Sequence, residues 1–342
     1  MAHLRRSLKA WLAALLLLAA GQAWAQTDYS LYGIADFSYG RFEPSGFEPR
    51  YQFNSNSLSA SFIGVELKHG FDSGWTVGTD LEAFVRFQDF QMGRTSEDPA
   101  LSRNAFAFIQ HPTYGTLRGG RLQTLLFDTT TRFNALGNST VFSPAMHQLF
   151  TSGNLEGVDE DFYWNRAVGY ASPKLFESVN ANLMYGRGPK GRTSDLAAAN
   201  VVYSSGLLAA ALSWQRVHFN DGIQDLSQES TWQLGATYNF GLARLFGLYT
   251  HTDDDGLDVR SNLTSAGFTV PVGPGTLAVQ AGYTTAKGPA VDRRHSSLSG
   301  AYIYPYDSLT DFYVIAMEDR IRNQTRGFSA AIGVRYKLNF VR

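Results

Sequence analysis

FSAAIGVRYKLNF, residues Phe328–Phe340, alternates between two kinds of side chain. Every even-numbered position is apolar or aromatic, whereas the odd-numbered positions include Ser329, Arg335 and Lys337. Successive side chains of a β-strand point to opposite faces of a sheet. The period of two therefore predicts a strand with one apolar face and one wet face.

The segment Trp75–Phe87 repeats this alternation near the other end of the chain. Asp80, Glu82 and Arg86 share one of its faces, and apolar residues occupy the other. A soluble sheet with one wet face gives the same pattern in a single strand. Here about sixteen such segments follow Tyr29, joined alternately by long polar connections and tight turns. This rhythm predicts an all-β fold, a 16-stranded antiparallel transmembrane β-barrel with long loops at one rim.

The turns and the aromatic residues fit the same barrel. Tight turns are expected near Gly70–Gly74, His111–Gly115, Ser172–Glu177, Ser204–Gly206, Asn239–Gly241, Pro271–Gly275 and Pro305–Leu309. Aromatic residues gather near the strand ends, where they would form girdles at the two membrane interfaces. They are Tyr29, Phe42, Phe71, Trp75, Phe87, Tyr114, Tyr238, Phe240, Tyr302, Tyr304, Phe312 and Phe340.

Residues 1–25 have the features of a secretory signal peptide. Three basic residues precede the apolar run Trp11–Ala20, and small residues at Ala23 and Ala25 suit cleavage before Gln26. About ten apolar residues are too few to cross a bilayer as a helix, which disfavours an uncleaved anchor. We therefore expect a mature barrel domain of residues 26–342, exported to the cell outer membrane.

The composition excludes several classes of protein. Without the first 25 residues, 26 Lys and Arg face 30 Asp and Glu, a net charge of −4 that implies no nucleic-acid surface. The chain has no Cys, so disulfides do not stabilise it. Its 33 Gly, 17 Tyr and 24 Phe suit strands and interfaces better than a helical membrane protein. Two soluble domains of the same total length are the alternative.

One connection, Gln123–Trp164, is much longer than the others. Long loops without secondary structure are usually functional in compact folds. Five phenylalanines give this one an apolar surface that can pack, and Glu156, Asp159, Glu160 and Asp161 give it negative charge. Folded into the barrel, the loop would narrow the lumen and place carboxylates there. An outward loop with a solvated acidic tip is the alternative.

Four short stretches resemble the Gram-negative porin family of trimeric, sixteen-stranded general-diffusion channels. Together the four stretches span nearly the whole mature chain, in the order and at the spacing that the family shows. They are Leu31–Asp36, Pro112–Arg121 with Phe127-Asp128, Arg166–Pro173 and the aromatic-ended last strand at Phe340. The resemblance implies an outer-membrane barrel, a homotrimer surrounded by lipid, and a third loop that folds inward.

The same resemblance implies a constriction where acidic residues of that loop face arginines on the wall. Arg121 matches the arginine before the loop, and Arg103 matches one early in the fourth strand. Arg86 is added from its strand parity. The acidic side would come from the carboxylates at residues 156 and 159–161. Arginines that only keep the interior hydrated are the alternative.

The chain departs from the family at a few positions. Phe62 stands where the family usually has a basic residue, and Val341 and Arg342 follow the terminal aromatic. Arg166 has the parity of the lipid-facing set unless a bulge intervenes.

Signatures of catalysis and cofactor binding were also sought. The seven histidines form no His-Glu-x-x-His motif, and Gly-x-Ser-x-Gly and Gly-Lys-Ser/Thr are missing from the sequence. Asp253–Asp255, beside His251, fits a solvated turn better than a cation site or a hydrolase. We therefore expect no enzyme, no cofactor and no metal. The sequence favours passive diffusion of ions and small hydrophilic solutes, with a solute-selective, anion-binding channel as the alternative.

Overall fold

The computed structural model describes residues 27–96, 98–152, 156–158, 162–188, 195–220 and 225–341. The predicted signal peptide lies outside them. The strands are β1 (Thr27–Phe42), β2 (Arg50–Ser55), β3 (Phe62–Gly70), β4 (Thr76–Arg86), β5 (Gln91–Met92), β6 (Ala105–His111), β7 (Gly115–Gln123), β8 (Tyr163–Ala171), β9 (Val179–Arg187), β10 (Asp195–Ser205), β11 (Leu208–Asn220), β12 (Asp225–Asn239), β13 (Arg244–Asp254), β14 (Val259–Val272), β15 (Gly275–Gly288), β16 (Val291–Pro305), β17 (Thr310–Ile321) and β18 (Gly327–Val341).

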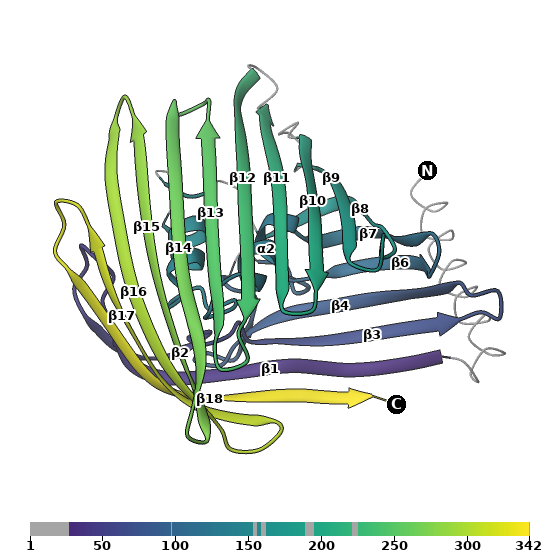
Figure 1. The fold of residues 1–342 in the computed structure, drawn as a ribbon, viewed down its shortest axis with the longest axis horizontal. Helices are drawn as coiled ribbons and strands as arrows, with labels where there is room; N and C mark the ends of the chain where they lie inside the picture. Colours follow the sequence, from purple (N-terminus) through teal and green to yellow (C-terminus); the bar gives the residue numbers. More distant parts are fainter. Residues whose placement is uncertain are drawn as a thin grey trace, which may run out of the picture.

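These strands form one antiparallel sheet that closes on itself (Figure 1). β1 pairs with β18 from Ser30↔Val341 to Arg41↔Ala330, so the sheet has no free edge there. β2 and β3 pair with successive parts of β1, and β5 and β6 pair with successive parts of β4. Each of these two pairs makes one wall strand in two pieces. The eighteen described strands therefore give a 16-stranded barrel, as the sequence predicted.

The two faces of the wall differ as the alternation requires. On β18, Ile332 and Phe340 are each 63% exposed on the outer face. Arg335 and Lys337 face inward. The Arg335 guanidinium lies 2.7 Å and the Lys337 ammonium 2.9 Å from the carboxylate of Asp311 on β17. The outer face thus presents apolar side chains to lipid, and the inner face keeps its charges paired and hydrated.

Two expectations at the strand ends are wrong. The alternation of apolar and polar residues extends over Leu58–His69 and predicts one strand across that range, but the wall strand begins at Phe62 and Leu58 is buried inside the barrel. Phe42 was expected in an interfacial girdle. It is buried against Phe142, with ring centroids 6.0 Å apart. In both cases contact with an inner segment outweighs the local pattern.

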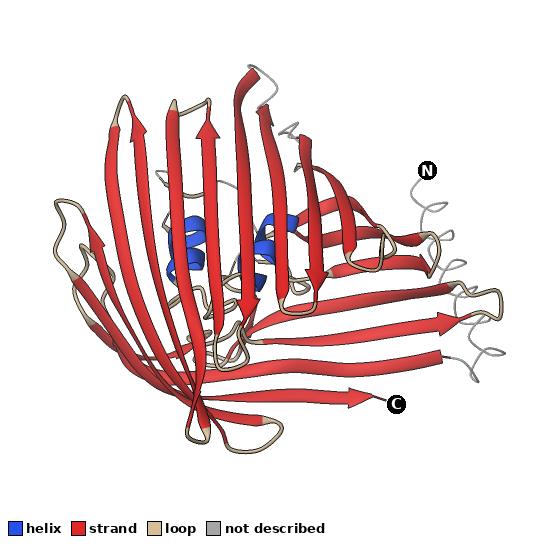
Figure 2. Ribbon diagram, viewed as in Figure 1, coloured by secondary structure: helices blue, strands red, loops and turns tan. Residues whose placement is uncertain are grey.

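The helices of the described ranges, drawn in blue in Figure 2, follow β7 and precede β8 in sequence. They are α2 (Leu125–Arg132), α3 (Pro144–Met146) and the π-helix η2 (His147–Thr151). None of the helices in the described ranges is long and apolar enough to cross a membrane.

Candidate functional site

Residues 124–162, here called the inner loop, leave the wall at the end of β7 and return to it at β8. Thr124 caps α2 by accepting a hydrogen bond from the backbone N–H of Phe127. The loop contacts the inner face of the wall at separate places. Thr129 Oγ1 lies 2.6 Å from Ser213 Oγ on β11, and Gln148 Nε2 donates to Ser297 Oγ on β16 at 2.8 Å. These contacts place its described parts inside the barrel.

Aromatic packing holds the root of the inner loop. The rings of Phe127 and Phe162 stack with centroids 4.8 Å apart, and Phe150 meets both of them edge-on. Tyr163, at the start of β8, packs edge-on against Phe84 of β4. The loop therefore has its own small apolar core. Its five phenylalanines predicted an apolar surface that packs.

Arg103 is buried just before β6. Its Nε lies 3.2 Å from Glu82 Oε2, and its Cζ lies 3.9 Å from the centroid of the Phe62 ring. Phe62 is the position where a basic residue was expected from the family, and in this chain it provides a flat platform for a guanidinium. Stacking of this kind adds a cation–π attraction and fixes the orientation of the guanidinium.

Arg121 lies at a bulge between β7 and β8. The pairing shifts between Gly120 and Leu122, and Gly120 has φ +146°. Only glycine adopts this conformation without strain. Arg121 donates to the carbonyl of Ser102 at 3.0 Å and to Asn165 Oδ1 at 3.0 Å. The bulge turns its side chain inward, and on β8 the same irregularity includes Arg166, whose φ is +50°.

The structure brings Arg103 and Arg121 together around one ring. Their Cζ atoms lie 5.7 and 5.4 Å from the centroid of Tyr163. Arg86 instead bonds within its own turn, with Nε 3.2 Å from Asp89 and Nη2 donating to Gln91 at 2.6 Å. Two of the three predicted arginines thus share one site at the root of the inner loop.

The predicted acidic residues are placed differently. Asp159, Glu160 and Asp161 lie outside the described residues. Glu156 has a fully buried side chain that faces β16, where Oε1 is 2.6 Å from His295 Nδ1 and Oε2 is 3.0 Å from Arg293 Nε. Its charge is neutralised at the wall.

The connection between β5 and β6 contacts the root of the inner loop. Arg94 donates from Nε and Nη2 to Asp98 at 2.9 and 3.0 Å, and its Cζ lies 5.2 Å from the ring centroid of Phe162. Burial alone would raise the pKa of Asp98, but the hydrogen bonds from Arg94 hold that pKa below its ordinary value. The β5–β6 connection is therefore tied to the inner loop by an ion pair and a ring.

Sequence reasoning missed a polar cavity of about 470 Å³ beside α2. It is lined by Asp80, Arg118 and Asp128, together with side chains from β6 to β9. The parity of Asp80 with Glu82 was the signal that could have found its β4 side. Both signs of charge meet in this cavity, because Arg118 lies among the carboxylates of Glu66, Asp80 and Asp128.

Comparisons with known proteins agree with this architecture. A model of the Gram-negative porin family matches residues 12–324. Outer membrane porin protein 32 of Delftia acidovorans is 27% identical over 317 residues, which cover 89% of this chain and 87% of that protein.

Solved structures show the same fold. An anion-selective porin from Comamonas acidovorans superposes with a TM-score of 0.76 at 20% identity, covering 92% of this chain and all of the other. The trimer form of Vibrio cholerae OmpT has a TM-score of 0.69 at 16% identity, covering 92% of this chain and 100% of that one.

Proposed function

The chain belongs to the Gram-negative porin family, and we propose that its inner loop sets the width and the charge of the narrowest part of its channel. As a porin it is an outer-membrane barrel through which ions and small hydrophilic solutes diffuse passively. The observation that carries the proposal is the attachment of the loop to the inner face of β11 and β16. The proposed role is transport without catalysis, by a mature chain cleaved near Ala25.

The proposed constriction has a basic side and an acidic side. Arg103 and Arg121, held at the Tyr163 ring, supply the basic side, and Arg86 contributes from the neighbouring turn. Asp159, Glu160 and Asp161 supply the acidic side, while Glu156 fixes the loop to the wall. An anion-selective channel is the second candidate, because two guanidiniums share one site and an anion-selective porin has a similar fold.

Replacing Arg103 and Arg121 by Gln is expected to shift ion selectivity toward cations. Two unit charges about 4 Å apart interact by about 1 kcal/mol even in bulk water, so each arginine lost should change the permeability ratio by about fivefold or more. The zero-current potential across a tenfold salt gradient measures this shift. Arg260→Gln, which removes an exposed rim arginine paired with Asp253, is the matched control and should leave the potential unchanged.

Amides at Asp159, Glu160 and Asp161 should shift the potential in the opposite direction. Removing fixed negative charge from a narrow lumen lowers the local cation concentration whatever the starting preference. Both variants must first be shown to form folded oligomers. An unchanged potential in the amide variant would place the acidic stretch outside the permeation path.

A homotrimer is the proposed assembly. The outer face of β1 and β15–β18 has an apolar groove of about 500 Å³ lined by Tyr39, Gly300, Val314 and Ile332. Small residues let surfaces approach closely in lipid, where van der Waals packing drives association. A second copy of this chain is the proposed occupant, since the solved OmpT of similar fold has a trimer form.

Gly300→Leu is expected to reduce the trimer fraction strongly. A Cβ at Gly300 has no neighbour within 4 Å, so the barrel itself accepts a side chain there, while the groove is filled. Gly247 on β13 is also free of neighbours within 4 Å and shares the outer face with Tyr249, so Gly247→Leu is the matched control. Mass measurement in detergent should find trimers in the control only. Equal trimer fractions in the two variants would place the interface elsewhere.

A further inference from the structure

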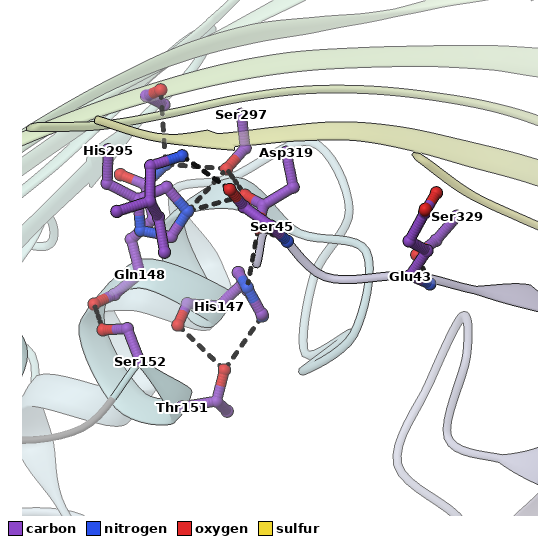
Figure 3. Close-up of polar contacts among 12 residues, drawn as sticks. Glu43, Ser45, His147, Gln148, Thr151, Ser152, His295, Ser297, Asp319 and Ser329 are labelled. Atoms are coloured by element: carbon purple, nitrogen blue, oxygen red, sulfur yellow. Dashed lines mark hydrogen bonds and ion pairs between the residues drawn. The ribbon is translucent and has the colours of Figure 1, made fainter. Parts of the chain in front are cut away.

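A cluster of charged and imidazole side chains joins the inner loop to two wall strands (Figure 3). His147 comes from η2, His295 from β16 and Asp319 from β17. His295 Nε2 lies 2.6 Å from Asp319 Oδ1, and His147 Nε2 lies 3.8 Å from Asp319 Oδ2. The side chains of His295 and Asp319 are only 1% exposed, whereas His147 is 17% exposed and can be reached by water.

Hydrogen bonds fix which nitrogen of His147 faces the cluster. Thr151 Oγ1 donates its proton to the carbonyl of His147 at 2.8 Å, so it accepts from His147 Nδ1 at 3.0 Å. In its neutral form His147 therefore carries the proton on Nδ1 and a lone pair on Nε2. That lone pair faces the Asp319 carboxylate, and two electron-rich groups aimed at each other are stabilised by a cation between them.

His295 lies between two carboxylates. Its Nδ1 is 2.6 Å from Glu156 Oε1 and its Nε2 is 2.6 Å from Asp319 Oδ1, and both nitrogens donate because a carboxylate only accepts. Ser297 Oγ donates to Asp319 Oδ1 at 2.7 Å, and the backbone N–H of Ser45 donates to Oδ2 at 3.0 Å. Histidines that bind metals commonly have their other nitrogen held in this way, and the carboxylates that bind are themselves hydrogen-bonded.

We propose that His147 Nε2, His295 Nε2 and the Asp319 carboxylate form a binding site for a transition-metal cation of the Zn²⁺ class. Their ligand atoms lie within 4.8 Å of one another. Two imidazoles and one carboxylate suit Zn²⁺ better than Mg²⁺ or Ca²⁺, which prefer oxygen ligands throughout. Water would take the fourth position.

Binding requires small changes that the site can make. Bonds of about 2.0–2.2 Å in a tetrahedron bring ligand atoms to roughly 3.3 Å from each other. His147 must move inward, and the 2.6 Å contact between His295 and Asp319 must open. The proton that His295 Nε2 donates to Asp319 must pass to water before the metal binds, while Nδ1 keeps its proton for Glu156. Arg293, beside Glu156, is a second cationic group that opposes binding.

A metal at this position would crosslink the inner loop to β16 and β17. The loop would then have less freedom to move, and the current through the open channel should fluctuate less. The property goes beyond passive diffusion, since it makes the channel responsive to a metal ion. Binding itself can be measured without any channel assay, so the test does not depend on the proposed constriction.

Calorimetric titration of the purified, folded full-length oligomer with zinc chloride tests the site. Wild type should bind one Zn²⁺ per chain. His147→Asn removes Nε2 but leaves a polar group near Thr151, and its side chain is exposed enough for the barrel to fold. It should bind Zn²⁺ at least about tenfold more weakly, since even groups behind the ligands contribute that much.

His111→Asn, at the last residue of β6, is the matched control and should bind as wild type does. In planar bilayers, Zn²⁺ should reduce current fluctuations in wild type and in His111→Asn, but not in His147→Asn. The proposal is overturned if wild type binds no Zn²⁺, or if His147→Asn binds it with unchanged affinity.

Discussion

An Asp36→Ala variant is expected to unfold at a markedly lower temperature than the wild-type barrel. The Asp36 side chain is fully buried and accepts hydrogen bonds from the backbone N–H groups of Ser57, Leu58 and Ser59 at 3.0 to 3.2 Å. It also accepts from the Tyr313 hydroxyl at 2.7 Å. Removing the carboxylate leaves four buried donors without an acceptor, and each costs about 1–3 kcal/mol. A loss of roughly 4 kcal/mol or more follows.

The matched control for this variant is Tyr313→Phe. It removes one donor and leaves the carboxylate with its three backbone partners, so a loss of only about 1 kcal/mol is expected. The change from folded to unfolded mobility on a gel, measured over a series of temperatures, compares the two. If both variants unfold at the same temperature, Asp36 does not hold residues 57–59.

The Asp36→Ala substitution should also loosen the inner loop. Ser139 Oγ, on that loop, donates to the carbonyl of Ser57 at 2.6 Å. The segment that Asp36 holds is therefore one of the supports of the loop, and its release should increase current fluctuations in planar bilayers. A local carboxylate on β1 would thus act on the channel through a chain of two hydrogen bonds.

The sequence was sufficient for the wall of the barrel. One face of each strand meets lipid, so a shift of one residue would expose every polar side chain, and the alternation therefore fixes which residues face inward. The tight turns follow the expected positions because Gly, Pro, Asn and Asp punctuate them. The pairing of Phe340 with Leu31 follows from closure alone.

The interior was harder to predict because its contacts join residues that are distant in the chain. Glu156 meets His295 across 139 positions, and neither residue carries a local signal of the other. Leu58 and Ala60 alternate with serines as a strand would, yet Asp36 draws this segment inward. At Arg166 a bulge changes the parity, as the sequence allowed without requiring it.

The supporting residues of the predicted constriction were also hidden. Arg103 was found from the family, but its partner Glu82 was known only as a wet-face residue. His147, His295 and Asp319 belong to no spacing motif, because they come from three separate elements. Only the closed sheet brings β16 and β17 beside the inner loop.

Phe340→Asp is expected to lower the yield of assembled porin in the outer membrane sharply. Phe340 is 63% exposed on the lipid face of β18 and pairs with Leu31 of β1, where the barrel closes. A carboxylate near a membrane interface costs at most about 1 kcal/mol, too little to unfold a closed barrel. The loss should therefore come from assembly, in which the family resemblance gives the terminal aromatic a recognition role.

Phe328→Asp, at the other end of β18 and 48% exposed, is the matched control and should assemble nearly normally. Quantifying folded barrels in isolated membranes compares the two, and refolding in detergent should give both variants the same thermal stability. Equal yields in the membrane would show that recognition does not depend on Phe340.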